Sequence, residues 1–320
     1  MTRRTIVIGA VLSCIGLPPA LVLLDAASLY SMNRTNGTII SSGQKREYIL
    51  YVPKSYVRGR PTPLVISMHA AMSWPSFQMA VSRWNKAADE HGFIVVYPAG
   101  EGGGPKTWFM RGSRTPSRMP DVVFISDLID KLEASYDIDP ARIYANGLSN
   151  GGGMAFALSC TLSNRIAAIG AVAAAQSLPW NWCPDSRPVP MIAFHGTADR
   201  FTPYNGAKVW LAPEPFPNVP EWVANWARRN RCAPHPIESA AASDVTRLEY
   251  TDCADDAAVM LYTIKGGGHT WPGGEPLPEW LLGPTSRSID ATSQMWAFFR
   301  QHPLKRSWPT PARGRFPFAF

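Results

Sequence analysis

The sequence predicts an α/β fold in which helices cover both faces of a mostly parallel central sheet. Short apolar runs of the kind that form buried parallel strands alternate along the chain with segments of helical periodicity. This alternation favours parallel pairing, because each helix carries the chain back to the same end of the sheet. The composition, with 46% hydrophobic and 17% charged residues, is that of a globular protein.

The expected elements follow one another from residue 45 to residue 300. Strands are expected over residues 45–52, 63–68, 93–98, 142–145, 166–173, 189–194 and 258–264. The first alternates between apolar and polar residues, which predicts an edge strand. Helices are expected over residues 78–91, 121–132, 152–158, 221–229 and 290–300. Gly92 ends the first of these helices, and Asp121 is expected to cap the second.

The chain is expected to divide into three parts. Residues 1–30 begin with basic residues and continue with an apolar run, the pattern of a signal peptide or an N-terminal membrane anchor, and Cys14 leaves lipidation open. Residues 38–302 are expected to form one α/β domain, and residues 303–320 a tail rich in proline and arginine. Much of the net charge of +7 lies in the leader and the tail. No basic stripe interleaved with aromatic residues runs through the domain, which argues against nucleic-acid binding.

The cysteines of the domain predict disulfides. Cys160, Cys183, Cys232 and Cys253 are an even number in a chain that carries an export pattern. Four cysteines allow three pairings, and the favoured one joins sequence neighbours, Cys160 with Cys183 and Cys232 with Cys253. No close pair of cysteines or histidines accompanies them, so no metal site is expected.

A serine between two glycines stands at an expected junction between strand and helix. Gly147-Leu148-Ser149-Asn150-Gly151 follows the strand at residues 142–145 and leads into the helix at residues 152–158. This is the pattern of a nucleophile elbow, in which a sharp turn strains the serine and exposes its hydroxyl near the N–H groups of a helix N-terminus. A glycine-rich turn with an incidental serine is the alternative for the motif taken alone.

A serine nucleophile needs a base, and the base needs a carboxylate that orients it. In α/β-hydrolases the acid and then the histidine follow the serine along the chain. His269 is the predicted base, because it lies in a glycine-rich loop directly after the strand at residues 258–264. Asp199 is the predicted acid, because it follows the strand at residues 189–194. His195 is expected to pack or hydrogen-bond near Asp199.

The tetrahedral intermediate of acyl transfer also requires N–H donors. The backbone N–H of Asn150, directly after the nucleophile, is one expected donor. Ala71, in the loop after the strand at residues 63–68, is the other, with Ala70 as the alternative. Trp108 and Trp271 lie in expected loops and are candidate substrate-binding surfaces, although packing beneath these loops is equally compatible with the sequence.

Five motifs in this order resemble one known family. They are Pro-Leu-Val-x-x-x-His at 63–69, Tyr-Asp-Ile-Asp-Pro-x-Arg-Ile-Tyr at 136–144, Gly-Leu-Ser-Asn-Gly-Gly at 147–152, His-Gly-Thr-Ala-Asp at 195–199 and Gly-Gly-His-Thr-Trp-Pro-Gly at 267–273. Together they resemble the secreted esterases that group polyhydroxybutyrate depolymerases with feruloyl and acetylxylan esterases. One departure is His69-Ala70, where the family usually has His-Gly.

The resemblance implies an α/β-hydrolase catalytic domain with a triad of Ser149, Asp199 and His269 and no cofactor. It implies hydrolysis of carboxylic esters outside the cell. Polyhydroxybutyrate depolymerase-like activity is the first expectation, and feruloyl or acetylxylan esterase activity on plant cell-wall polysaccharide is the alternative. The expected partner is the ester substrate, and membrane contact is expected only through the possible N-terminal anchor.

Three other functions stay open at this stage. An acyltransferase or a serine peptidase can use the same fold, and an acceptor alcohol or an amide substrate would distinguish them from an esterase. A polymer-binding protein without catalytic activity is the alternative from another class. The presence of all three triad residues argues against that alternative.

Overall fold

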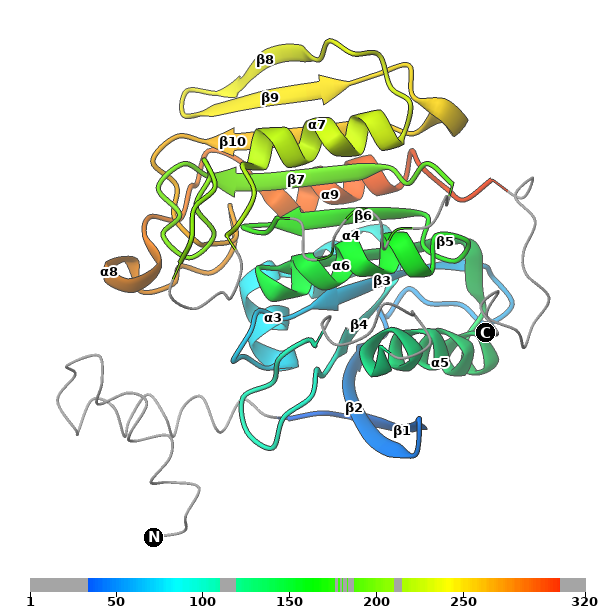
Figure 1. Ribbon diagram of the computed structural model, residues 1–320. Helices are drawn as coiled ribbons and strands as arrows, with labels where there is room; N and C mark the ends of the chain where they lie inside the picture. The colour runs from blue at the N-terminus through cyan, green and yellow to red at the C-terminus, as the bar shows by residue number, and fades with distance from the viewer. Residues whose placement is uncertain are drawn as a thin grey trace, which may run out of the picture.

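One mixed sheet organises the molecule (Figure 1). The computed structural model describes residues 34–109, 119–175, 178, 180, 183, 187–209 and 215–305. The expected leader at residues 1–30 lies outside the described residues, as does all of the expected tail after residue 305. None of the helices within the described ranges is both long and apolar enough to cross a membrane.

The sheet has the strand order β1-β2-β4-β3-β5-β6-β7-β10-β9-β8 within the described residues. Its strands are β1 (Gly37–Ser41), β2 (Gln44–Tyr51), β3 (Thr62–Met68), β4 (Ile94–Pro98), β5 (Ile138–Leu148), β6 (Ala168–Val172), β7 (Met191–Gly196), β8 (Ile237–Ala242), β9 (Val245–Tyr250) and β10 (Val259–Ile264). All neighbouring pairs from β4 to β10 are parallel. Antiparallel hairpins, β1–β2 and β8–β9, close the two edges.

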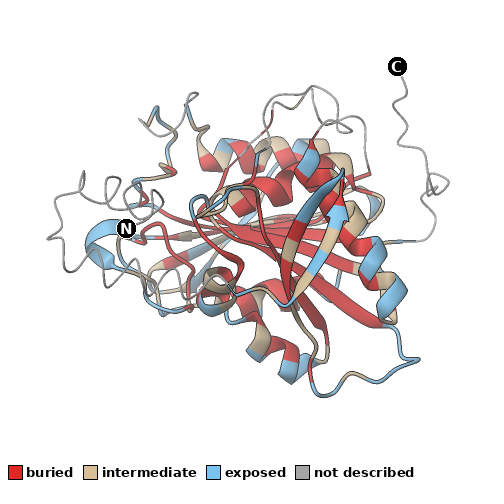
Figure 2. Cartoon of the chain, turned by 90° about the horizontal axis from the view of Figure 1, so that it is seen from below, coloured by how far each residue is buried: buried red, intermediate tan, exposed pale blue. Residues whose placement is uncertain are grey.

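Helices cover both faces of this sheet. They are α3 (Pro75–Ser82), α4 (Trp84–His91), α5 (Pro120–Ser135), α6 (Asn150–Thr161), α7 (Val219–Arg229), α8 (Glu279–Leu282) and α9 (Ala291–Phe299). One core cluster joins α5, α6 and α7 to the sheet, and a second joins α3, α4 and α9 to it. Figure 2 shows the central strands buried between these layers. The predicted α/β architecture is therefore confirmed.

Two local predictions about the helices were wrong. The helix expected over residues 78–91 is two helices, because Arg83 adopts a left-handed conformation with φ of 55° and its N–H ends α3 by bonding the Met79 carbonyl. After this break Trp84 turns into the core and stacks on Phe299. Asp121 does not cap α5, because the helix begins at Pro120 and Asp121 lies in its buried first turn.

The hairpin β8–β9 has no counterpart among the expected strands. Half of the residues of β8 are small alanines, so the strand lacks the alternation of large apolar and polar residues by which a half-buried strand is recognised. It adds an edge to the sheet next to β10.

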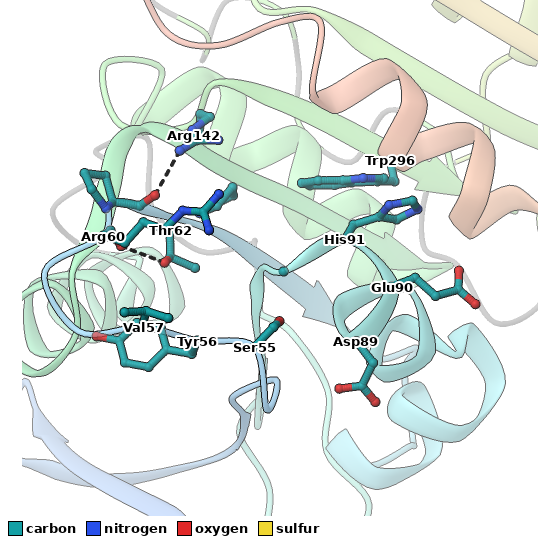
Figure 3. A pocket seen from close by; sticks show the side chains of 13 residues that line it. Ser55, Tyr56, Val57, Arg60, Thr62, Asp89, Glu90, His91, Arg142 and Trp296 are labelled. Atoms are coloured by element: carbon teal, nitrogen blue, oxygen red, sulfur yellow. Dashed lines mark hydrogen bonds between the residues drawn. The ribbon is translucent and has the colours of Figure 1, made fainter.

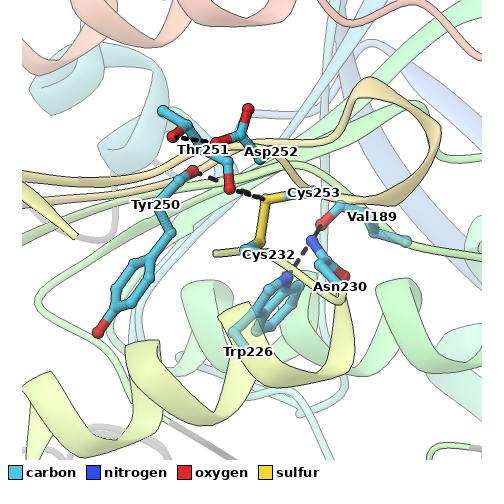
Figure 4. Close-up of a disulfide and its surroundings, with 8 residues drawn as sticks. All are labelled: Val189, Trp226, Asn230, Cys232, Tyr250, Thr251, Asp252 and Cys253. Atoms are coloured by element: carbon cyan, nitrogen blue, oxygen red, sulfur yellow. Dashed lines mark hydrogen bonds between the residues drawn. A yellow bond between two sulfur atoms is a disulfide. The ribbon is translucent and has the colours of Figure 1, made fainter. Parts of the chain in front are cut away.

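Both predicted disulfides are present. Cys160, near the end of α6, is bonded to Cys183, and Cys232, after α7, is bonded to Cys253, after β9. Figure 4 shows the second disulfide close to the end of α7, where Trp226 and Asn230 both donate to the carbonyl of Val189. On the chain-entropy model, a loop of this length gives each disulfide about 3 kcal/mol of stabilisation.

Candidate active site

Ser149 occupies a strained turn between β5 and α6. Its φ of 55° and ψ of −118° lie outside the regions that residues with a side chain ordinarily adopt. Two backbone hydrogen bonds hold it there, from its own N–H to Val172 and from Gly153 to its carbonyl, of 2.8 and 3.0 Å. Gly151 must be glycine, because a Cβ at this position would overlap the carbonyl of Met68. The local geometry is that of a nucleophile elbow.

The loops that carry Asp199 and His269 touch each other at the same edge of the sheet. Asp199 follows β7 and His269 follows β10, and these strands are parallel neighbours. The loops approach so closely that a Cβ on Gly196 would overlap the carbonyl of Gly267. A backbone hydrogen bond of 2.9 Å from Ala198 to Gly267 joins them. The elbow follows β5, which lies two strands away from β7 and runs parallel to it.

The structure brings Asp199 and His269 into direct contact. His269 Nδ1 lies 2.8 Å from Asp199 Oδ2, and both side chains are buried. Asp199 Oδ1 accepts the N–H groups of Phe201 and Thr202, both at 2.8 Å. Burial by itself raises the pKa of Asp199, but the hydrogen bond and charge of His269, with smaller contributions from His195 and the Thr202 N–H, outweigh it and lower the pKa. The ionised carboxylate therefore keeps the His269 proton on Nδ1 and leaves Nε2 able to accept one.

A second imidazole faces the same carboxylate. His195 Nε2 lies 2.7 Å from the carbonyl of Thr202 and 3.5 Å from Asp199 Oδ2. Because a carbonyl only accepts, Nε2 carries the proton. Burial lowers the pKa of His195 more than the attraction of Asp199 and the backbone hydrogen bonds of the ring raise it, which favours the neutral imidazole. His195 thus hydrogen-bonds beside Asp199, as its place in the sequence predicts.

Ser149 and His269 do not hydrogen-bond to each other in this structure. Within the ranges that the structure describes, neither Ser149 Oγ nor His269 Nε2 has a hydrogen-bond partner. Such contacts are often long in unliganded enzymes and tighten when substrate binds. The backbone N–H of His269, which donates to Leu282 at 2.6 Å, ties the base to α8.

Among the described residues, the N–H groups of the two expected oxyanion donors have no hydrogen-bond acceptor. Asn150 is the first residue of α6, where N–H groups have no partner within the helix. The carbonyl of Ala70 accepts from His69 Nδ1 at 2.7 Å. In a trans peptide the N–H points opposite to the carbonyl, so the N–H of Ala71 points away from the His69 ring. No described residue accepts from either N–H group.

Trp108 and Trp271 do not offer the surfaces expected of them. Trp108 is 2% exposed and donates through Nε1 to the carbonyl of His69 at 2.9 Å. Trp271 is 0% exposed and donates to Thr292 Oγ1 at 3.0 Å. Covered indoles whose N–H groups are already bonded pack beneath the loops, which is the alternative that the sequence left open for both residues.

Three large apolar side chains on the segments that carry the candidate site are more than half exposed. Met72, next to Ala71, is 62% exposed, and Phe109, next to Trp108, is 53% exposed. Trp280 is 63% exposed on α8, the helix tied to His269. The sequence places Met72 and Phe109 next to candidate residues, but it shows neither their exposure nor the link between α8 and His269. Exposed apolar groups near a site are typical of ligand-binding surfaces.

The cavity drawn in Figure 3 lies elsewhere. It has a volume of about 330 Å³, and Tyr56, Arg60, His91, Arg142 and Trp296 are among its lining residues. Its lining includes the residues just before β3 and β4, at the amino ends of the parallel strands. The candidate catalytic residues follow the opposite, carboxyl ends. Within the described ranges, no group of three or more His, Cys, Asp or Glu side chains could hold a metal ion.

Comparisons with known proteins agree with this fold. Residues 46–176 match the family model described as "Esterase PHB depolymerase". Feruloyl esterase B of Piromyces equi is 31% identical over 231 residues, which are 70% of this chain and 42% of that protein. Poly(3-hydroxyalkanoate) depolymerase C of Paucimonas lemoignei is 23% identical over 280 residues, 79% of this chain and 65% of that protein. The chain thus spans less than half of the first relative and just under two thirds of the second.

A solved structure shows the same architecture. The acetyl xylan esterase from Aspergillus awamori has a TM-score of 0.60 at 15% identity, covering 82% of this chain and 98% of its own. At this identity the likeness concerns the fold alone. The chain has the α/β-hydrolase fold and is homologous to proteins named as feruloyl esterases, an acetylxylan esterase and a poly(3-hydroxyalkanoate) depolymerase.

Proposed function

We propose that this chain is a serine hydrolase of carboxylic esters, with Ser149 as nucleophile, His269 as base and Asp199 as the carboxylate that orients it. The observation that carries the proposal is the buried hydrogen bond of 2.8 Å between Asp199 and His269. It lies at the sheet edge where Ser149 adopts its strained elbow conformation. A strained serine and an oriented imidazole at one edge are the groups that acyl transfer needs.

In the first step Ser149 Oγ attacks the ester carbonyl carbon while His269 Nε2 takes the hydroxyl proton. Asp199 stabilises the imidazolium that forms. The carbonyl oxygen becomes an oxyanion and accepts from the N–H groups of Asn150 and Ala71. His269 then gives its proton to the departing alcohol as the carbon–oxygen bond breaks, which leaves an acyl-serine.

In the second step water replaces the alcohol. His269 takes a proton from the water molecule as its oxygen attacks the acyl carbon, and the oxyanion forms again. The bond to Ser149 Oγ then breaks, and His269 returns the proton to that oxygen. The products are one carboxylic acid and the regenerated serine.

The proposed substrates have apolar parts next to the ester. Polyesters of hydroxyalkanoic acids are the first candidate, supported by the family-model match and by the homologous depolymerase. Feruloyl esters are the second candidate, supported by the feruloyl esterase with 31% identity, and acetylated xylan is the third, supported by the homologous acetylxylan esterase. Exposed Met72, Phe109 and Trp280 favour an alkyl chain or a phenolic ring over a bare acetyl group. The two disulfides support action outside the cytoplasm.

Turnover of hydroxybutyrate oligomers, feruloyl esters and acetylated xylan by the purified protein tests the proposal. Ser149→Ala is expected to reduce kcat by about 10⁶-fold, as loss of a catalytic serine does elsewhere. Repeating the reaction with an acceptor alcohol separates hydrolysis from acyl transfer. Unchanged turnover in the alanine variant would contradict the assignment of Ser149.

A further inference from the structure

The side chain of Asn150 holds a neighbouring backbone segment with both ends of its amide. Asn150 Oδ1 accepts the N–H of Trp108 at 2.7 Å, and Asn150 Nδ2 donates to the carbonyl of Trp108 at 3.2 Å. Two bonds to one residue fix the position and the rotation of the amide. Asn150 also carries one of the two expected oxyanion donors, but in its backbone.

Trp108 reaches the segment that carries the second donor. Its indole Nε1 donates to the carbonyl of His69 at 2.9 Å, and its ring lies 5.1 Å from the His69 ring. His69 Nε2 accepts the N–H of Gly100 at 3.0 Å, which leaves the proton on Nδ1 for the carbonyl of Ala70. Burial lowers the pKa of His69 to about 4, so this arrangement persists at neutral pH. The peptide that contains the N–H of Ala71 is thereby fixed.

Two buried charged side chains, Arg46 and Asp121, hold the ends of the segment that contains Trp108. Asp121 Oδ2 accepts the N–H of Phe109 at 2.8 Å. Arg46 forms an ion pair with the other oxygen of Asp121 and donates to the carbonyl of Ala99 at 3.1 Å. Arg46 and Asp121 are both buried. The segment from Ala99 to Phe109 is therefore anchored at both ends and joined in between to both donor segments.

We propose that the Asn150 side chain and Trp108 form a positioning clamp that sets the distance between the N–H groups of Asn150 and Ala71, and so the strength with which they bind the oxyanion. The inference rests on the proposed function. Both side chains bond main-chain atoms and have no part in the bond-making steps of the proposed mechanism, so both are positioning residues. An alanine at position 150 keeps its N–H and loses only the clamp.

The chain contains a matched control. Asn36 makes the same two bonds to the backbone of Leu50, donating at 2.8 Å and accepting at 2.7 Å. This second clamp is exposed and lies beside β2, near one edge of the sheet. Asn36→Ala therefore removes an equivalent pair of hydrogen bonds without affecting the donor segments.

The test compares p-nitrophenyl butyrate with its thionoester, in which sulfur replaces the carbonyl oxygen. Sulfur accepts hydrogen bonds poorly, so the ratio of the two kcat values reports oxyanion binding. The wild type is expected to prefer the oxygen ester by about 10²-fold, the magnitude of one oxyanion donor. Both substrates meet the same folded molecules, so the ratio does not depend on how much of a variant is folded.

Asn150→Ala is expected to lower kcat for the oxygen ester by about 30-fold at unchanged KM, because displacement of an aligned N–H group is costly. The same variant is expected to lower kcat for the thionoester by less than about 3-fold. Trp108→Phe keeps an aromatic ring at this position but loses the hydrogen bond to His69. It is expected to lower the ratio of the two kcat values less than Asn150→Ala does. Asn36→Ala should keep the wild-type ratio.

If Asn150→Ala keeps the wild-type ratio of kcat for the oxygen ester to kcat for the thionoester, the clamp proposal is overturned. If that variant does not fold, a wild-type ratio in Trp108→Phe overturns the proposal instead. If the wild type hydrolyses neither substrate, the proposed function fails instead.

Discussion

The two halves of the candidate site are built differently. On the acid–base half, one functional side chain bonds another directly, since His269 donates to Asp199 at the ends of β7 and β10. On the oxyanion half, the groups that would act are backbone N–H groups of Asn150 and Ala71. The side chains of that half, including His69 and Trp108, bond main-chain atoms instead.

Because one half acts through side chains and the other through backbone N–H groups, the two halves should respond differently to amino-acid substitution. A side chain on the acid–base half can be replaced, and its chemistry then disappears. A backbone N–H cannot be removed by substitution, so the oxyanion half is altered only through the contacts that hold it. Loss of a proton relay and loss of alignment should therefore leave different kinetic signatures.

The largest expected effect breaks the acid–base half alone. Asp199→Asn is expected to lower kcat by about 10⁴-fold, because an amide facing His269 Nδ1 favours the tautomer that cannot take the serine proton. The loss should be equal for the oxygen ester and the thionoester. A loss confined to the oxygen ester would mean that Asp199 acts on the oxyanion instead.

The next effect concerns the ion pair behind the oxyanion half. Arg46→Met leaves the carboxylate of Asp121 buried without its partner, which is expected to lower the free energy of unfolding by about 3 kcal/mol at pH 8. Burial already raises the pKa of Asp121, and loss of Arg46 raises it further. With its pKa raised in the folded variant, Asp121 takes up a proton as the pH falls, and the buried neutral carboxyl no longer needs a charged partner. The loss of unfolding free energy caused by Arg46→Met should therefore shrink as the pH falls from 8 to 5.

Urea unfolding of the Arg46→Met variant at several pH values measures this change, with the wild type at the same pH as reference. A destabilisation that stays constant or grows toward pH 5 would contradict the role given to the buried pair.

The smallest expected effect on catalysis lies outside both halves. Replacing Cys232 and Cys253 by alanine removes a disulfide between cysteines that are 21 residues apart in the sequence. The free energy of unfolding is expected to fall by about 3 kcal/mol on the chain-entropy model. The variant should keep wild-type kcat values for both esters at temperatures where it is folded. A changed ester ratio would show that stability and alignment are not separate properties of this fold.

The acid–base residues could be proposed from the sequence because each one follows an apolar strand in a short glycine-containing loop. Ser149 follows β5, Asp199 follows β7 and His269 follows β10, so parallel topology alone brings the three to one edge. The disulfides could be predicted for a similar reason, since neighbouring cysteines close short loops.

The contacts of the oxyanion half could not be predicted, because they join residues that are distant in sequence. Arg46 and Asp121 are 75 residues apart, and Trp108 and Asn150 are 42 apart. The burial of Trp108 and Trp271 depends on how complete loops pack, which hydropathy does not reveal. The break at Arg83 is likewise a local change of backbone direction, next to the buried Trp84, that helical periodicity does not reveal.

The most direct test of the triad is the site and rate of labelling by a fluorophosphonate, mapped by mass spectrometry. We predict one phosphonate, attached to Ser149, and labelling at least about 10³-fold slower in His269→Ala, because the serine then lacks its base. Labelling at another residue, or at the same rate without the imidazole, would contradict the account.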